Sequence, residues 1–128
     1  MWIFMNDAFL SIVVPHPSDI PAHHKKTPNL MVVRARRKID LTNSFGRGAD
    51  IIEGGPERDY RWRVFLPRSI IADFVFEAVN SIDYHNFKDS IPAKDKDRKR
   101  AYGSVWACMD RFQAEATPRH RRDLGGDY

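Results

Sequence analysis

The sequence predicts an α+β domain in which helices pack on one face of an antiparallel β-sheet. Residues 30–37 and 59–66 carry apolar side chains at every second position, the period of two that is typical of strands. Residues 67–82 and 96–114 repeat their apolar side chains with the period of an α-helix. Because strands and helices do not alternate regularly, a doubly wound parallel sheet is not expected. The preferred topology is ferredoxin-like with an added N-terminal β-hairpin.

Strands and a loop are expected in the N-terminal third. Residues 2–14 favour a β-hairpin, because two apolar runs flank Asn6-Asp7 and both residues tolerate the positive φ angles of a two-residue turn. Residues 15–29 are rich in proline, which prevents regular helices and ladders, so they are expected to form a loop. The strand at 30–37 places alternate side chains on opposite faces. One face carries Met31, Val33 and Ala35, and the other carries Val32, Arg34 and Arg36.

A short helix and two more strands are expected in the middle of the chain. Residues 40–45 favour a helix that Asp40 would cap and that Gly46 or Gly48 would end. Residues 49–53 are expected to form a short strand. The strand at 59–66 carries Tyr60, Trp62, Val64 and Leu66 on one face, and Arg61, Arg63 and Phe65 on the other.

Two longer helices are expected in the C-terminal half. Pro67 begins a helix to about residue 82, and a connection over 83–90 precedes a second helix at 96–114, with Asp95 and Asp97 as its capping residues. Residues 1–116 are interpreted as one α+β domain, and residues 117–128 as a polar, flexible tail. The expected apolar stripes are Ile70, Ile71, Phe74, Val75, Ala78 and Val79 on the first helix, and Tyr102, Val105, Trp106, Met109 and Phe112 on the second.

Composition indicates the general class of the protein but says little about its function. A chain of 128 residues that is 42% hydrophobic suits one globular domain with its own core. The single cysteine, Cys108, excludes an intramolecular disulfide, fits a reducing cytoplasmic compartment and is expected to be a buried, inert thiol. The N-terminus lacks the basic region of a signal peptide, and no stretch has the length of a membrane-spanning helix, so no membrane partner is expected. The net charge of +4 mildly favours acidic partners, nucleic acid among them.

Short motifs spread from residue 2 to about residue 112 carry a resemblance. The most distinctive is Ile82-Asp83-Tyr84-His85-Asn86-Phe87-Lys88, and the others are Trp2 and Phe4 with Phe9-Leu10-Ser11-Ile12-Val13, Val33-Arg34-Ala35-Arg36, Asp59-Tyr60-Arg61, Pro67 and Val105-Trp106. In these motifs the chain resembles a family of short uncharacterised bacterial and phage proteins. The resemblance implies a compact single domain and no particular activity, and it excludes the loop at 15–29 and the tail after 115.

The first candidate site is a set of arginines on two predicted strands. Arg34 and Arg36 share a face of one strand, and Arg61 and Arg63 share a face of the other. If these strands are neighbours in register, four guanidinium groups meet on one sheet face, where their planar forks would bind phosphates or carboxylates. The alternative is a solvated face, or one paired with carboxylates of the chain itself.

The second candidate is the segment between the long helices. It brings a carboxylate, an imidazole, an amide and an ammonium group together in Asp83, Tyr84, His85, Asn86 and Lys88. One interpretation is that His85 acts as a general acid or base, or that Lys88 contacts a phosphate. The favoured reading is structural, with Tyr84 and Phe87 filling the space between helices and the polar groups capping helix ends.

Two further patterns involve basic and metal-ligating side chains. A charge run supplies Lys96, Arg98, Lys99 and Arg100, which are expected to form either a phosphate-binding rim or a solvated face. His16, His23 and His24 lie in the proline-rich loop without a regular spacing or a nearby cysteine. No metal site and no cofactor are therefore expected.

The leading functional hypothesis is a non-enzymatic binding module with a protein or nucleic-acid partner. One alternative is a small hydrolase or nuclease that uses Asp83, His85 and Lys88. Another is an oligomeric structural or assembly protein, and self-association as a homodimer is left open.

Overall fold

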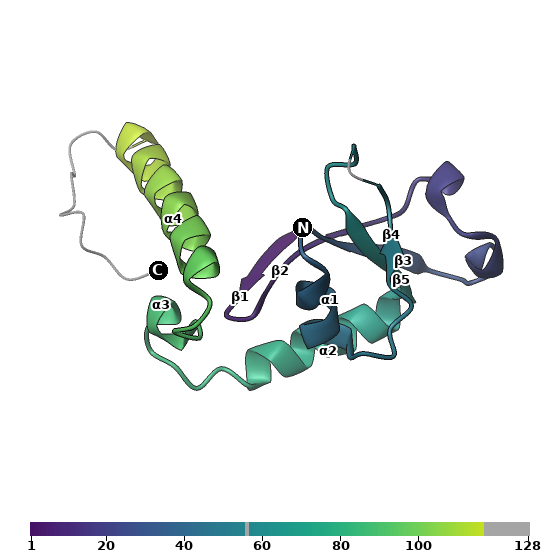
Figure 1. Cartoon of the computed structure of the whole chain (residues 1–128), viewed down its shortest axis with the longest axis horizontal. Helices are drawn as coiled ribbons and strands as arrows, with labels where there is room; N and C mark the ends of the chain where they lie inside the picture. The colour runs from purple at the N-terminus through teal and green to yellow at the C-terminus, as the bar shows by residue number, and fades with distance from the viewer. Residues whose placement is uncertain (56, 117–128) are drawn as a thin grey trace. The chain divides into compact units, whose positions relative to one another are not determined.

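A five-stranded antiparallel sheet is the central feature of the computed structural model, which describes residues 1–55 and 57–116. The strand order is β1-β2-β3-β5-β4, and each pair of neighbours is antiparallel (Figure 1). The predicted α+β class with an antiparallel sheet is therefore confirmed. The strands are β1 (Trp2–Met5), β2 (Ala8–Val13), β3 (Leu30–Ala35), β4 (Ile52–Glu53) and β5 (Trp62–Pro67).

The chain divides into two compact units, Met1–Ile82 and a second unit that begins at Asp83. The first unit contains the sheet, and the second contains helices. The assignment of 1–116 to a single domain stays a prediction, and the expected tail at 117–128 lies outside the described residues. The helices are α1 (Lys38–Phe45) and α2 (Arg68–Asn80) in the first unit, and α3 (Phe87–Ser90) and α4 (Lys96–Ala116) in the second.

The N-terminal hairpin forms as predicted. Met5 pairs with Ala8 across the Asn6-Asp7 turn, and Trp2 pairs with Ser11 at the open end. The following segment, expected to be a loop, contains two short 3₁₀ turns, η1 (Pro17–Asp19) and η2 (Ala22–His24). Proline favours such turns because its fixed φ angle suits them and continued ladders are excluded.

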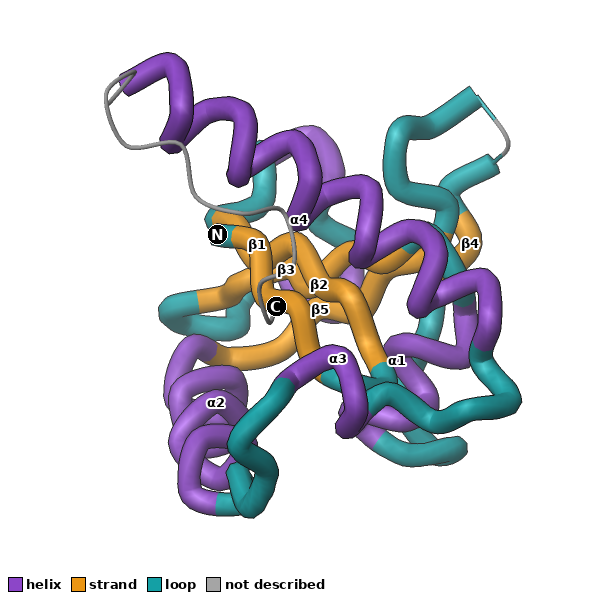
Figure 2. Tube along the Cα trace, turned by 90° about the vertical axis from the view of Figure 1, so that its left-hand side faces the viewer, coloured by secondary structure: helices purple, strands orange, loops and turns teal. Residues whose placement is uncertain are grey.

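The two faces of the sheet pack against different parts of the chain. Met31, Val33 and Val64 lie in a core that α1 and α2 cover with Leu41 and Ile71. The opposite face, called the open face here, carries a smaller cluster of Leu30, Val32 and Phe65, with Val13, Ile20 and Ile52 packed against it. The predicted alternation along β3 and β5 is confirmed, because the two sets of side chains separate onto these faces. Figure 2 shows the strands of the sheet side by side.

The packed stripe of α2 is narrower than expected. Ile71 is buried, and Phe74 packs on the core beside Phe45 of α1, with ring centroids 4.7 Å apart. Ile70 and Val79 are instead 49% and 61% exposed. The sheet contacts only one side of the helix, so side chains at the margins of the apolar stripe remain in solvent.

Asp40 does not cap α1, which corrects the sequence-based expectation. The helix begins at Lys38 with Arg37 as its N-cap, and Asp40 lies in the first turn, only 3% exposed. Its Oδ2 atom accepts a hydrogen bond of 2.9 Å from the backbone N–H of Phe9 on β2. Gly46 does end the helix, with a φ of 87° that favours glycine.

The ferredoxin-like arrangement is not confirmed. After the hairpin, the first unit runs β3-α1-β4-β5-α2, which follows the start of the β-α-β-β-α-β order of that arrangement. Among residues 1–55 and 57–116, no strand follows α2. The position beside β3 is filled by β2 of the hairpin instead.

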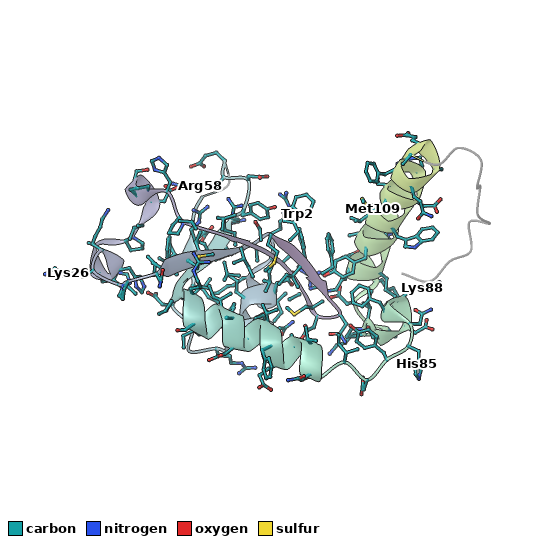
Figure 3. The ribbon with its side chains drawn as sticks, turned by 180° about the vertical axis from the view of Figure 1, so that it is seen from behind. Trp2, Lys26, Arg58, His85, Lys88 and Met109 are labelled. Atoms are coloured by element: carbon teal, nitrogen blue, oxygen red, sulfur yellow. The ribbon has the colours of Figure 1, made fainter. Side chains whose placement is uncertain are left out.

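Local side chains determine where the helices of the second unit begin. Asn86 caps α3 by accepting the backbone N–H of Asp89 at 3.1 Å. Asp95 accepts the backbone N–H of Arg98 at 3.2 Å, which confirms its predicted capping role at α4. Cys108 is exposed rather than buried, because it lies beside the apolar stripe of α4 rather than on a packed surface. Met109 on that stripe is itself 56% exposed (Figure 3).

Candidate anion-binding site on the open face

Arg34 and Arg63 lie directly opposite each other on neighbouring strands. The register of β3 and β5 pairs these two residues, and the register of β2 and β3 pairs Ser11 with Arg34. Cross-strand partners project from the same face of a sheet. The predicted meeting of arginines on one face therefore occurs, and Arg34 and Arg63 are its centre.

Neutral groups of the chain orient the two guanidinium groups. Arg34 donates from Nη2 to Ser11 Oγ at 2.8 Å, and Arg63 donates from Nη2 to the backbone carbonyl of Tyr60 at 3.2 Å. The guanidinium carbon of Arg34 also lies 4.6 Å from the centre of the Tyr60 ring. Neither arginine forms an ion pair within the described part of the chain.

Each of the two arginines keeps one unsatisfied donor. Arg34 Nε and Arg63 Nε are buried and have no hydrogen-bond partner among residues 1–55 and 57–116. Burial lowers the pKa of the Arg63 guanidinium, the neighbouring charges of Arg58 and Arg34 lower it further, and Asp19 opposes them. The fold thus holds Arg63 next to a second cation, at a position where desolvation and the neighbouring positive charges disfavour its own charge.

A cavity of about 180 Å³ lies against these arginines. Val13, Val32 and Phe65 form part of an apolar wall, and Arg34, Arg63, His16 and Asp19 add polar groups. The single carboxylate in this lining, on Asp19, pairs with Arg58 at 3.4 Å. An apolar cavity with a few convergent polar groups is the usual form of a small-molecule site, and its two arginines favour an anionic group.

Arg36 and Arg61, the other two predicted site residues, are paired with carboxylates. Arg36 donates to the backbone oxygen of Asp59 at 2.8 Å and lies 3.2 Å from its carboxylate. Arg61 contacts the Glu53 carboxylate at 2.7 Å. Their side chains are about half exposed, at 53% and 51%. The interpretation that carboxylates of the chain pair with these arginines therefore holds for Arg36 and Arg61, and anion binding by Arg34 and Arg63 stays a prediction.

Tyr60 is a site residue that the alternation pattern assigned to the wrong face. The strand β5 begins at Trp62, and Tyr60 lies in a bend before it, 4% exposed. Its ring lies between the guanidinium groups of Arg34 and Arg36, at 4.6 and 4.5 Å. Period-two alternation does not continue through the bend, so the prediction that Tyr60 lies on the same face as Trp62 is wrong.

Aromatic side chains extend the same face beyond the arginines. Trp2 pairs with Ser11, which in turn pairs with Arg34, so the three residues form one row across β1, β2 and β3. Phe9 lies 5.6 Å from Trp2 between ring centroids in an edge-to-face contact. Trp2 is 63% exposed, and Figure 3 shows it on the side of the sheet away from α2. The place of Trp2 in one row with Arg34 depends on strand register, which local sequence patterns do not reveal.

The segment at 83–88 is organised around an aromatic contact. Phe87 lies between Tyr84 and Tyr102, with ring centroids 5.9 Å from each. Asn86 caps α3, and His85, in the middle of the segment, is exposed (Figure 3). These contacts agree with the structural interpretation for Tyr84, Phe87 and Asn86, and the roles of Asp83, His85 and Lys88 stay predictions.

The charge run at the start of α4 does not form one uniform rim. Arg98 is only 4% exposed and donates from Nε to Asp95 at 2.8 Å and from Nη1 to Tyr102 at 3.1 Å. Arg100 is exposed and lies 3.7 Å from Asp97. Arg98 therefore has a role inside the unit, whereas Lys96, Lys99 and Arg100 remain on or near the surface.

No family model, curated protein or solved structure matches this chain. The resemblance to short bacterial and phage proteins therefore stays a prediction. Among the described helices, none has both the length and the apolar character that crossing a bilayer requires.

Proposed function

We propose that the first unit is a non-enzymatic module that binds single-stranded nucleic acid on the open face. A backbone phosphate would enter the cavity beside Arg34 and Arg63. The observation that carries the proposal is the opposed pair itself: two adjacent arginines, each with a buried, unpartnered Nε, line one cavity. An anion between them would reduce the repulsion between the two arginines and add to the opposing effect of Asp19.

Arginine suits this role better than lysine would. Its planar fork donates two parallel N–H groups to one phosphate, and it is more weakly hydrated than an ammonium group. Ser11 and the Tyr60 carbonyl each occupy one Nη atom and thereby orient the fork. Binding to preoriented donors loses less conformational entropy than binding to mobile side chains.

Trp2 supports a single-stranded ligand over a duplex. It lies two strands from Arg34, a separation of about 10 Å at ordinary strand spacing. An unpaired base could stack on the exposed indole while its neighbouring phosphate occupies the cavity, since aromatic platforms beside cationic grooves are typical of single-strand binding. In a duplex the bases are stacked on each other and are not available to the indole.

The test is fluorescence anisotropy with labelled single-stranded DNA, single-stranded RNA and duplex DNA across a salt series. The double variant Arg34→Gln, Arg63→Gln removes the cavity pair, and Arg36→Gln, Arg61→Gln removes the same charge from the carboxylate-paired arginines. We expect the first double variant to lose about tenfold or more in affinity and to show a shallower salt slope. The matched control should lose less than about threefold, because those charges are already paired.

Two outcomes would contradict the proposal. Equal losses in the two double variants would mean that net charge, and not the cavity, determines binding. Absence of binding by the wild-type chain at low salt would exclude nucleic acid as the ligand. Circular dichroism of each variant separates lost binding from lost folding.

A further inference from the structure

We propose that His23, His24 and Asp50 form a binding site for a divalent transition-metal ion of the zinc type. One ligand atom from each of these residues lies within 4.8 Å of the other two. The histidines belong to η2, and Asp50 follows α1, so the fold joins segments that are distant in sequence. This inference is independent of the arginine cavity and of nucleic-acid binding.

The ligand set and its spacing suit zinc. Imidazole nitrogen and carboxylate oxygen both bind Zn²⁺ at about 2.0–2.2 Å, and two such ligands in a tetrahedral shell lie about 3.3 Å apart. His23 Nε2 and Asp50 Oδ2 are 3.1 Å apart. Three protein ligands would leave the fourth position to water, as in open zinc sites.

Contacts around His24 restrict its position. The backbone N–H of His24 donates to the Pro21 carbonyl at 2.9 Å, and the N–H of Thr27 donates to the His24 carbonyl at 3.0 Å. The His24 ring contacts Thr27 Oγ1 through Nδ1 at 3.4 Å and lies 6.1 Å from the ring of Phe65. A ring held by a polar neighbour and an aromatic one is partly preoriented for a ligand.

Asp50 is held by a compact turn after α1. The N–H of Ala49 donates to the Gly46 carbonyl at 3.3 Å, and the N–H of Ile51 donates to the Ala49 carbonyl at 3.0 Å. Of the cations nearby in sequence, Lys25 donates its ammonium group to the Pro17 carbonyl at 3.1 Å. The two backbone bonds of the turn position the main chain at Asp50, whose carboxylate contacts His23.

The competing explanation is a surface ion pair between His23 and Asp50, whose side chains are 60% and 66% exposed. Exposed pairs of this kind are common and contribute little to stability. The ion pair between His23 and Asp50 forms without His24 and without added metal. The metal site requires both His24 and the metal ion.

The test is isothermal titration of the full-length, metal-stripped chain with Zn²⁺, together with the visible absorption of the Co²⁺ form. We expect one ion per chain with a Kd in the micromolar range, an absorption band of tetrahedral intensity, and a melting temperature that rises with free Zn²⁺. His23→Ala, His24→Ala and Asp50→Asn should each weaken binding at least tenfold. Asp50→Asn keeps an oxygen that can accept from His23, so it separates metal binding from hydrogen bonding.

Matched controls make the assignment specific. His16→Ala removes a histidine of the same loop that is outside the cluster, and Cys108→Ser removes the exposed thiol. Neither change should alter Zn²⁺ affinity by more than about twofold. The proposal is overturned if wild-type protein does not bind Zn²⁺ in this range, if either control abolishes binding, or if the three ligand variants bind as tightly as wild type.

Discussion

Arg34 and Arg63 face each other across β3 and β5, and each keeps a buried Nε without a hydrogen-bond partner in the described chain. Such an arrangement costs stability, because burial removes water from both donors and brings like charges together. Residues retained at a cost to folding are often retained for binding. The cost to stability can be measured by replacing one of the two arginines.

Arg63→Met should leave the free energy of unfolding within about 1 kcal/mol of wild type, because the lost bond to the Tyr60 carbonyl is offset by the removal of a disfavoured charge. Urea denaturation of both proteins measures this difference. A loss of several kcal/mol would show that Arg63 is mainly structural. The same variant should bind single-stranded nucleic acid at least tenfold more weakly.

Trp2→Ala should weaken single-strand binding by about tenfold, since stacking of one base on an aromatic side chain contributes about 1–3 kcal/mol. Folding should change little because the indole is 63% exposed. Phe76→Ala is the matched control, since Phe76 is 64% exposed on α2 and so belongs to the other side of the sheet. Anisotropy with a labelled oligonucleotide measures both variants, and equal losses would refute a stacking role for Trp2.

The sequence predicts the faces of the sheet well and its register poorly. Alternation is local, so it places Arg34 with Val32 and Arg63 with Phe65, as the structure confirms. Register depends on how distant strands pair, and it decides that Arg63 rather than Arg61 meets Arg34. A period-two pattern contains no information about that choice.

Contacts made by residues outside the strands could not be predicted from the sequence either. The bend before β5 removes Tyr60 from the alternation, and the turn after α1 brings Asp50 to His23, 27 residues away. The expected burial of Cys108 failed because an apolar stripe on α4 does not by itself identify a packed surface. These misses share one cause: tertiary contacts decide which side of an irregular or helical segment is covered.

Asp40→Ala should destabilise the first unit by about 1–3 kcal/mol, because it leaves the partly buried N–H of Phe9 without this acceptor. Asp40→Asn should lose less, since an amide oxygen can still accept that bond. Chemical denaturation followed by circular dichroism compares the two variants. A cost below about 0.5 kcal/mol for Asp40→Ala would show that the link from α1 to β2 contributes little.

Asp95→Ala should be the most damaging single carboxylate change in the second unit. Asp95 caps α4 through the backbone N–H of Arg98 and also pairs with the Arg98 side chain, which is 3% exposed. Removing one partner of a buried ion pair typically costs about 3–5 kcal/mol, and the lost cap adds about 1 kcal/mol. Asp97→Ala is the matched control, because Asp97 is 87% exposed and lies 3.7 Å from an equally exposed Arg100. That control should change stability by less than about 1 kcal/mol. Thermal melts followed by circular dichroism, which reports the helix directly, measure both variants. Similar melting temperatures for the two variants would show that the Asp95–Arg98 pair does not stabilise α4.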